Sequence, residues 1–318
     1  MAFYPALLPA ALALVALPDI GQAPPPPPDQ TYVLLKEVAE RMTVPVQIAG
    51  SGPYRFIIDT GAERTVISRQ LASTLNLPAG RDINVVAMSG VSRVGTVVIP
   101  SLTMSTLPDI GAINAPALDA DHLGGLGLLG IDTLQHHKVT IDFDGERMAV
   151  TPSSKRSRPE RRQANEIVVR AKNVFGQLIV TDAEIDGNAV RVVLDTGSPV
   201  SIGNLALQRL VRRHAGKFEP LEMTSATGGK LQTQLTRANK LRIGGVEFVG
   251  MPLAFSDAAP FERFGLEKKP AMLLGMNALK FFRQVEIDFP NREVRFQLPR
   301  QERVATRCLS AFNGQCTA

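Results

Sequence analysis

Short runs of alternating apolar and polar residues cover most of the chain, with turn residues recurring about every eight to twelve positions. Such alternation predicts strands, and the abundance of Val, Ile, Thr and Gly favours them further. Two of the runs predict hairpins: residues 84–98 with a turn at Ser89 and Gly90, and residues 221–236 with a turn at Thr227–Gly229. The pattern therefore predicts an all-β protein.

Only short helices are expected between these strands. One begins near Ser68 and a second near Asn204, and both residues are suitable N-caps. One more helix follows each of two Leu-Leu-Gly segments, at residues 128–130 and 273–275.

Two apolar strands run directly into the same triplet, Asp-Thr-Gly. The first carboxylate, Asp59, follows Phe56-Ile57-Ile58, and the second, Asp195, follows Val192-Val193-Leu194. A carboxylate placed there is either desolvated or held by hydrogen-bond donors, and both arrangements are costly. Taken alone, an Asp-Thr-Gly is typical of a turn in which the Asp caps the local backbone.

The similarity extends well beyond the triplet. Upstream, residues 44–59 parallel residues 182–195, and downstream, residues 128–150 parallel residues 273–296. The two aspartates are 136 residues apart. A unit of about a hundred residues therefore occurs twice, and this duplicated context favours a paired-aspartate site over two unrelated turns.

An apolar strand entering Asp-Thr-Gly, a following hairpin and a later Leu-Leu-Gly before a short helix resemble the aspartic peptidase family. Each half is more similar to the retropepsin-like (retroviral-type) unit than to a pepsin lobe, because it is short and carries such motifs as Ile-Asp-Thr-Gly-Ala. Two such units in tandem resemble bacterial exported aspartyl proteases, over residues 40–150 and 166–298. The resemblance implies two β-barrel halves in a bilobal, pseudo-twofold architecture with few short helices.

The resemblance also implies roles for the motif residues. Asp59 and Asp195 would be the catalytic pair that activates a water against a peptide bond. Thr60 and Thr196 would interlock across the pseudo-twofold axis. Around Gly130 and Gly275, the Leu-Leu-Gly segments would pack beneath the active-site loops.

Three further residues would support these loops. Gly61 and Gly197 let backbone amides approach the carboxylates without an intervening Cβ. Ser198 would donate its hydroxyl to Asp195, whereas Ala62 offers Asp59 no such donor. On this expectation the shared proton resides mainly on Asp59.

The two predicted hairpins would cover the cleft as flaps, with Ser89, Gly90, Gly228 and Gly229 as the candidate flap residues. Neither hairpin contains a tyrosine, which departs from pepsin-like enzymes; Tyr4, Tyr32 and Tyr54 all lie elsewhere.

These features divide the chain into five segments. We expect a signal-like apolar segment with a polyproline spacer at residues 1–30, an N-terminal half at 31–150 and a C-terminal half at 166–299. A basic linker at 151–165 joins the halves, and residues 300–318 form a tail.

The first segment favours export. Residues 6–17 are twelve apolar residues, typical of a signal-peptide core and too short to span a bilayer comfortably. No Lys or Arg precedes them, and a buried strand or helix is the alternative; the stiff run Pro24–Pro28 suits a tether better. We expect a periplasmic or otherwise extracytoplasmic protein.

The net charge of +5 does not indicate a nucleic-acid partner. Residues 151–165 hold five basic residues and one acid, so a solvated linker explains most of the excess. Cys308 and Cys316 could close a small loop in an oxidising compartment. No metal and no cofactor are expected.

Four other polar residues are candidates for a functional site. Asp142 and Asp288 also recur in both halves, but each precedes a turn, which indicates a surface or capping role. His136 and His137 align with Phe281–Phe282 in the second half, and we interpret them as helix-surface residues rather than a metal site.

Two functional classes fit the sequence. The first is an aspartic endopeptidase that acts on extended segments of exported or membrane-tethered proteins. It would act as a monomer whose two halves form an intramolecular pseudo-dimer. The second is a catalytically silent peptide-binding module of the same fold. A lesser alternative is that each half pairs with its counterpart in another chain.

Overall fold

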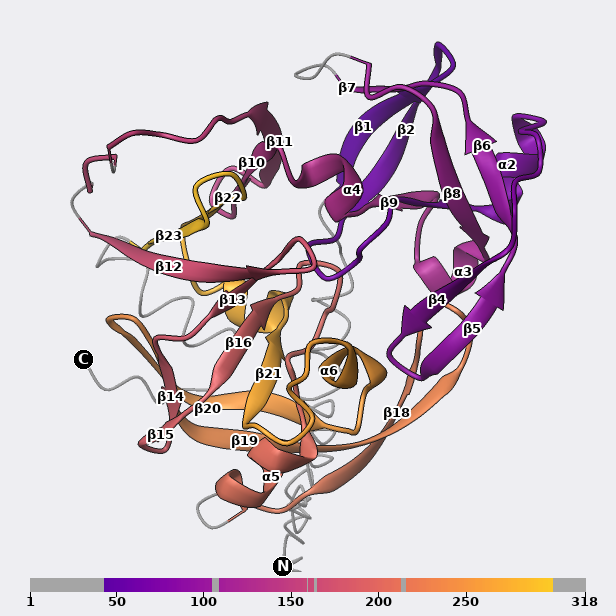
Figure 1. Cartoon of the computed structure of the whole chain (residues 1–318). Helices are drawn as coiled ribbons and strands as arrows, with labels where there is room; N and C mark the ends of the chain where they lie inside the picture. Colours follow the sequence, from indigo (N-terminus) through magenta and orange to yellow (C-terminus); the bar gives the residue numbers. More distant parts are fainter. Residues whose placement is uncertain (1–42, 105–108, 159, 163–164, 213–215, 300–318) are drawn as a thin grey trace, which may run out of the picture.

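The computed structural model describes residues 43–104, 109–158, 160–162, 165–212 and 216–299. Figure 1 shows two lobes built mainly of strands, with the N-terminal half in indigo to magenta and the C-terminal half in pink to yellow. The predicted all-β, bilobal fold with few short helices is confirmed. The expectations for the signal-like segment, the polyproline spacer and the two cysteines fall outside the described residues.

The N-terminal lobe is a seven-stranded sheet in the order β6-β8-β3-β9-β2-β1-β7, beside a separate hairpin of β4 and β5. The strands are β1 (Thr43–Ile48), β2 (Ser51–Ile58), β3 (Val66–Ser68), β4 (Ile83–Ala87), β5 (Gly90–Val94), β6 (Thr96–Ile99), β7 (Leu102–Met104), β8 (Ile113–Leu118) and β9 (Gly127–Leu129).

A second sheet of fourteen strands forms the C-terminal lobe and crosses into the first half of the chain. From the first half come β10 (His137–Asp142) and β11 (Arg147–Pro152). The others are β12 (Glu166–Val174), β13 (Gln177–Val180), β14 (Ala183–Ile185), β15 (Asn188–Ala189), β16 (Arg191–Leu194), β17 (Ile202–Gly203), β18 (Glu219–Thr224), β19 (Lys230–Ile243), β20 (Val246–Phe255), β21 (Ala271–Leu274), β22 (Gln284–Asp288) and β23 (Glu293–Gln297).

The two lobes are joined where β10 pairs with β22 in antiparallel register, from Lys138 opposite Asp288 to Asp142 opposite Gln284. Val139 and Ile287 are partners in this register, and both side chains are completely buried. The fourteen-stranded sheet therefore contains strands from both halves of the chain, and one apolar cluster contains residues of both lobes.

The sequence repeat is visible in the strand pairing. Strand β2 pairs in parallel with β9, and β16 pairs in parallel with β21. In these registers Ile58 lies opposite Leu129, and Leu194 lies opposite Leu274. Each Asp-Thr-Gly thus follows a strand that pairs with the Leu-Leu-Gly strand of its own half.

The helices are short, and four of them lie where the sequence predicts: α2 (Arg69–Thr74), α4 (Ile131–Leu134), α5 (Leu205–Val211) and α7 (Met276–Leu279). The predicted caps are present, since Ser68 accepts from the Leu71 N–H at 3.1 Å and Asn204 from the Leu207 N–H at 2.8 Å.

Two helices were not predicted, α3 (Ala120–Leu123) and α6 (Ala259–Arg263). Helices of four and five residues are too short to show a helical period in the sequence. None of the helices in the described ranges is long and apolar enough to cross a membrane.

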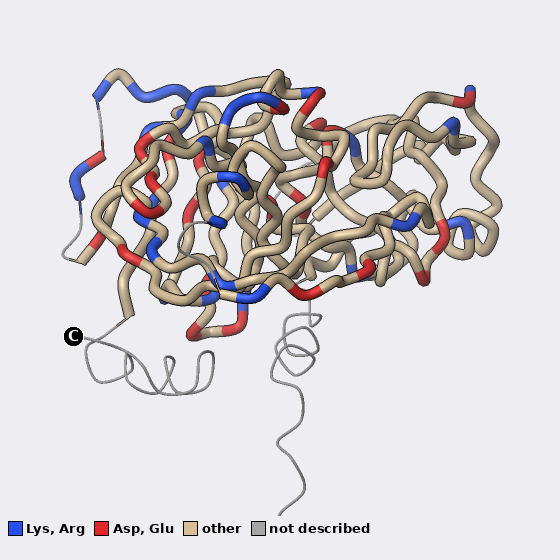
Figure 2. The backbone as a smooth tube through the Cα atoms, turned by 90° about the horizontal axis from the view of Figure 1, so that it is seen from below, with Lys and Arg blue, Asp and Glu red and all other residues tan. Residues whose placement is uncertain are grey.

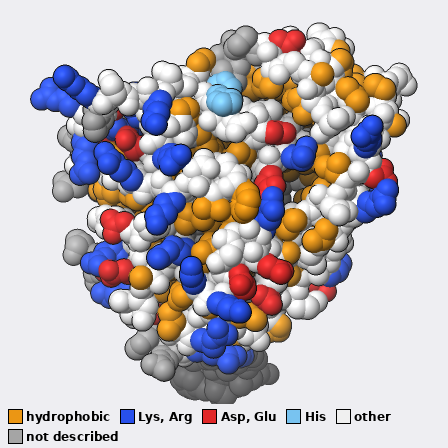
Figure 3. Space-filling view, in the orientation of Figure 1, with side chains coloured by type: hydrophobic (Ala, Val, Ile, Leu, Met, Phe, Trp, Pro, Cys, Tyr) orange, Lys and Arg blue, Asp and Glu red, His pale blue; other side chains and the backbone are white. Residues whose placement is uncertain are grey.

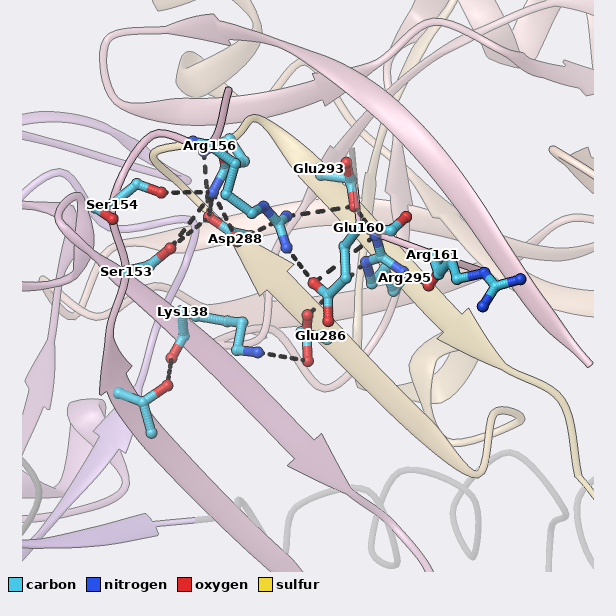
Figure 4. Close-up of polar contacts among 12 residues, drawn as sticks. Lys138, Ser153, Ser154, Arg156, Glu160, Arg161, Glu286, Asp288, Glu293 and Arg295 are labelled. Carbon is cyan, nitrogen blue, oxygen red and sulfur yellow. Dashed lines mark hydrogen bonds and ion pairs between the residues drawn. The ribbon is translucent and has the colours of Figure 1, made fainter. Parts of the chain in front are cut away.

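In the described part of the basic linker, Lys155, Arg158, Arg161 and Arg162 are exposed, whereas Arg156 is partly buried. Arg156 lies against the interlobe strands, where its guanidinium pairs with Asp288 at 3.2 Å and with Glu293 at 3.5 Å (Figure 4). Its backbone N–H donates to Asn291 Oδ1 at 2.8 Å. The linker is therefore attached to the hairpin of β22 and β23 by charge and by backbone bonds.

Charges meet beneath this linker as well. Arg295 is only 5% exposed and pairs with Glu293 (Figure 4). It also pairs with Glu166 at 2.9 Å. Elsewhere, Figure 2 shows Lys and Arg interspersed with Asp and Glu along the chain. The excess of basic residues in the linker is thus partly neutralised by acids of the interlobe sheet.

Both recurrent aspartates outside the triplets cap turns, but only one is at the surface. Asp142 accepts from the Gly145 N–H at 2.9 Å and pairs with Arg147. Asp288 accepts from the Asn291 N–H at 3.1 Å and is buried, because the linker covers it.

Candidate active site

The two Asp-Thr-Gly loops begin in the same way at the ends of their strands. The backbone N–H of Asp59 donates to the Leu129 carbonyl at 3.0 Å, and that of Asp195 donates to the Leu274 carbonyl at 3.0 Å. These bonds continue the parallel pairing by one residue. Each aspartate is thereby fixed to the Leu-Leu-Gly strand of its own half.

Each carboxylate is held by the amides of its own loop. Oδ1 of Asp59 accepts from the N–H groups of Gly61 at 2.8 Å and Ala62 at 3.0 Å. Oδ1 of Asp195 accepts from those of Gly197 at 3.0 Å and Ser198 at 3.1 Å. Backbone donors at a carboxylate favour its ionised form and fix its orientation.

Thr60 and Thr196 bind the two loops to each other. The Thr60 hydroxyl donates to the Leu194 carbonyl at 2.8 Å, and the Thr196 hydroxyl donates to the Ile58 carbonyl at 2.7 Å. Each threonine N–H donates to the other's Oγ1, at 3.0 and 3.2 Å. Both side chains are buried, so these four bonds form a closed, reciprocal link between the lobes.

Each carboxylate also lies against the glycine of the opposite loop. A Cβ atom on Gly61 would lie 2.7 Å from Cγ of Asp195, and one on Gly197 would overlap the carboxyl group of Asp59. Neither glycine has a positive φ, so glycine is needed for space rather than for backbone conformation. The two aspartates, 136 positions apart, therefore line one cavity.

A matching hydrogen-bond network supports each loop from below. In the first half, Asp132 Oδ1 accepts from the N–H and the hydroxyl of Thr65, both at 2.8 Å, and the same hydroxyl accepts from the Gly130 N–H at 3.1 Å.

In the second half, Asn277 Oδ1 accepts from the N–H and hydroxyl of Ser201 at 2.9 and 2.7 Å, and that hydroxyl accepts from the Gly275 N–H at 3.0 Å. A Cβ on Gly275 would lie 2.7 Å from the carbonyl carbon of Val200. The Leu-Leu-Gly segments thus pack directly against the active-site loops.

The hydroxyl of Ser198 does not do what the resemblance implies. It donates to the Val200 carbonyl at 2.7 Å, and a hydroxyl has a single proton to donate. Ser198 reaches Asp195 through its backbone N–H instead, as Ala62 reaches Asp59. The prediction that a side-chain donor at Ser198 distinguishes Asp195 from Asp59 is therefore wrong.

The flap candidates lie at the turns of the two predicted hairpins. Ser89 is in the turn from β4 to β5, Gly90 is the first residue of β5, and Gly228 and Gly229 are in the turn from β18 to β19. The hairpin tips touch, because the hydroxyls of Ser89 and Ser225 are 2.7 Å apart.

Each tip also contacts the opposite lobe. The Met88 carbonyl accepts from the N–H of Ala259, at the start of α6, at 3.3 Å. A Cβ on Gly228 would lie 2.6 Å from Cε1 of His122 in α3. In Figure 1 the β4–β5 hairpin reaches toward α6, across the space between the lobes.

The cavity under the hairpins has a volume of about 430 Å³ and is lined by both lobes and both tips. Besides the aspartates, much of its wall is apolar, including Val85, Leu128 and Leu273. Figure 3 shows hydrophobic side chains on this face, interspersed with charged ones. An elongated, mainly apolar cleft with a few polar groups is typical of a site for a ligand.

Gln177 is a cleft residue that the sequence reasoning missed. Its side chain comes from β13 of the second half and donates through Nε2 to the Gly61 carbonyl of the first half. Its Oε1 is buried and has no hydrogen-bond partner within the described residues. A glutamine outside the repeated motifs gave no sequence signal for this contact.

The two adjacent histidines lie beyond α4 rather than on it, which corrects their placement. His136 is exposed in a turn, and His137 begins β10, with Nδ1 2.8 Å from the Thr133 carbonyl oxygen. Burial lowers the pKa of the His137 side chain.

Comparison with protein families gives two matches along the chain. The family described as "gag-polyprotein putative aspartyl protease" matches residues 44–136, and the family described as "Aspartyl protease" matches residues 181–278. Together these ranges span more than half of the chain, and each contains one Asp-Thr-Gly. The chain therefore belongs to the aspartic peptidases, as a retropepsin-like enzyme with two tandem units.

Among solved structures, the chain is similar to a retropepsin-like aspartic protease from Rickettsia conorii. That protein is 20% identical, and the alignment covers 42% of this chain and 90% of that chain with a TM-score of 0.30. The search of curated proteins found no significant match.

The acceptor of the supporting network is Asp132 in the first half and Asn277 in the second, and this difference predicts a pH effect. Burial raises the pKa of Asp132, although the hydrogen bonds from Thr65 oppose the rise. The folded protein therefore holds a proton there more readily than the unfolded chain does, and this contribution to stability is lost as pH rises above the ordinary Asp range. Asn277 shows that a neutral amide fits the equivalent place.

We therefore expect Asp132→Asn to raise the free energy of unfolding near pH 7, with the gain shrinking toward about pH 3, where Asp132 is protonated in both states. Urea denaturation across this range measures the difference. A wild type that is the more stable protein near pH 7 would contradict the assignment.

The close approach of each glycine to the opposite carboxylate predicts that Gly197→Ala inactivates the enzyme. The added methyl group must displace the Asp59 carboxyl, and a misplacement of about 1 Å costs on the order of a hundredfold in rate. Gly95→Ala is the control, since the nearest atom to its Cβ is Asp82 Oδ1 at 3.8 Å. Equal kcat/KM for both variants, at equal thermal stability, would show that the glycine is not needed.

Proposed function

We propose that Asp59 and Asp195 form one catalytic pair that hydrolyses peptide bonds in extended protein segments through an activated water. The observation that supports this best is the reciprocal packing of each carboxylate against the glycine of the opposite loop. It places two acids from distant parts of the chain in one cavity, within loops that the threonines hold together.

The proposed chemistry follows from the proximity of two carboxyl groups. Like charges so close cannot both ionise cheaply, so the pair shares one proton in its active state. The ionised member takes a proton from the attacking water, and the protonated member donates to the carbonyl oxygen of the substrate. Collapse of the tetrahedral intermediate then transfers a proton to the leaving nitrogen, and the pair returns to its starting state.

The shape of the cleft favours an extended peptide as the substrate. The β4–β5 and β18–β19 hairpins border the cavity and carry backbone groups along its roof. An extended chain can add main-chain hydrogen bonds to such strands, while its alternate side chains enter the apolar wall. The contact between Ser89 and Ser225 must open to admit a chain that continues beyond the cavity at both ends.

A silent peptide-binding module would have the same cleft, but it has no physical need for two adjacent carboxylates. Four backbone amides hold these carboxylates, and four threonine bonds hold their loops together. The pairing of β10 with β22 within one chain supports a monomer acting as a pseudo-dimer. Export, and with it a membrane-tethered substrate, rests on the apolar run at residues 6–17 alone.

Asp59→Asn and Asp195→Asn are each expected to lower kcat/KM at least about a hundredfold, because either change removes one member of the acid–base couple. Cleavage of a mixed peptide library, with and without a statine-type inhibitor, supplies the assay. Asp142→Asn is the matched control, since Asp142 is the last residue of β10 and does not line the cavity. If either site variant keeps a tenth of wild-type activity with an unchanged fold, the paired mechanism fails.

A further inference from the structure

One end of the cavity is bridged by an ion pair between the lobes. Glu63 follows Asp59-Thr60-Gly61-Ala62 in the first active-site loop, and Arg263 is the last residue of α6 in the second lobe. Arg263 Nε is 2.9 Å from Oε1 of Glu63, and its Nη2 is 3.4 Å from Oε2. Both residues line the cavity that contains the catalytic pair.

The guanidinium of Arg263 is held in place from two sides. Glu63 binds the edge formed by Nε and Nη2, and the ring of Phe175 lies beneath the plane with its centroid 4.2 Å from Cζ. Nη1 makes no hydrogen bond within the described residues. A fixed guanidinium with one unused donor group is suited to a second, planar acceptor such as a carboxylate.

The charges at this end favour an acid as that acceptor. Besides the two aspartates, the Lys, Arg, Asp and Glu residues that line the cavity are Glu63, Arg64 and Arg263, and their sum is one positive charge. Both oxygens of Glu63 accept from Arg263, so the negative charge of Glu63 is already compensated and attracts a basic side chain less.

The second copy of the repeat has no charged residue at the position equivalent to Glu63. The position that follows the second Asp-Thr-Gly at the same spacing as Glu63 is Pro199, which carries no charge and also lines the cavity. The cleft is therefore symmetric at the aspartates but asymmetric in charge at its ends. An extended substrate would meet the charged end on only one side of the bond that is cut.

We propose that Arg263, positioned by Glu63 and Phe175, is a specificity-determining residue that binds an acidic side chain of the substrate at one end of the cleft. This role rests on the proposed peptidase function. It predicts a preference for Glu over Gln at one substrate position, on one side of the scissile bond.

The test starts from a peptide that the wild type cleaves and that Asp59→Asn does not. Variants of this peptide carry Glu, Gln or Lys at each position around the cut, and the ratio of kcat/KM for Glu to that for Gln is measured on each enzyme. A ratio within one enzyme cancels any general loss of activity. At one position the wild type should give a ratio of about three to five, the size that a partly exposed ion pair supports.

Opposite substitutions should move this ratio in opposite directions. Arg263→Gln should bring it to about one, whereas Glu63→Gln, which adds one net positive charge, should raise it. Arg242→Gln is the control, because Arg242 and Glu184 form a similarly exposed pair that does not line the cavity. It should leave the ratio unchanged.

A wild-type ratio near one at every position would overturn the proposal, as would a ratio that Arg263→Gln does not change. Neither outcome would touch the catalytic pair, because cleavage would still be lost in Asp59→Asn. A wild type that cleaves no peptide would instead contradict the peptidase function and, with it, this role of Arg263.

Discussion

The reciprocal hydrogen bonds of Thr60 and Thr196 are the constraint on which the rest of the site depends. Each hydroxyl donates to the carbonyl that precedes the opposite aspartate, at Leu194 or Ile58. Because both bonds are buried and far from competing water, they fix the relative position of two loops that lie on separate lobes. The packing of each carboxylate against the glycine of the opposite loop presupposes that position, whereas the amides hold each carboxylate within its own loop.

A symmetric frame of this kind allows the two halves to diverge around it. The network below the loops uses Asp132 on one side and Asn277 on the other, with nearly the same geometry. Next to the aspartates, the symmetry is strict in the backbone donors and relaxed in the side chains, as Ala62 and Ser198 show. The divergence is greatest at the ends of the cleft, where Glu63 has Pro199 as its counterpart.

The sequence was sufficient to predict the parts of the structure that occur in both copies of the repeat. Strands ending in Asp-Thr-Gly, the Leu-Leu-Gly segments and the hairpin turns are local patterns, and the duplication raised each above chance. It was not sufficient for contacts that occur once and join distant segments, such as Gln177 with Gly61 or Arg263 with Glu63.

The wrong prediction for Ser198 and the missed contacts of Arg156 have similar causes. The hydroxyl of Ser198 has two acceptors within reach of its loop, and only the folded backbone decides that it donates to Val200. The linker was interpreted from its composition, which contains no information on the acids of β22 and β23 that bind Arg156. Local chemistry predicts which groups can bind, but tertiary structure selects the partner.

The central claim is that one chain supplies both aspartates of a single active site. Complementation tests it most directly: equal amounts of Asp59→Asn and Asp195→Asn chains are unfolded, refolded together and assayed beside wild type at the same total concentration. If the pair forms within one chain, the mixture should show no more cleavage than the two variants refolded separately. Recovery of activity in the mixture would mean that the aspartates pair between chains, and it would contradict the single-chain site.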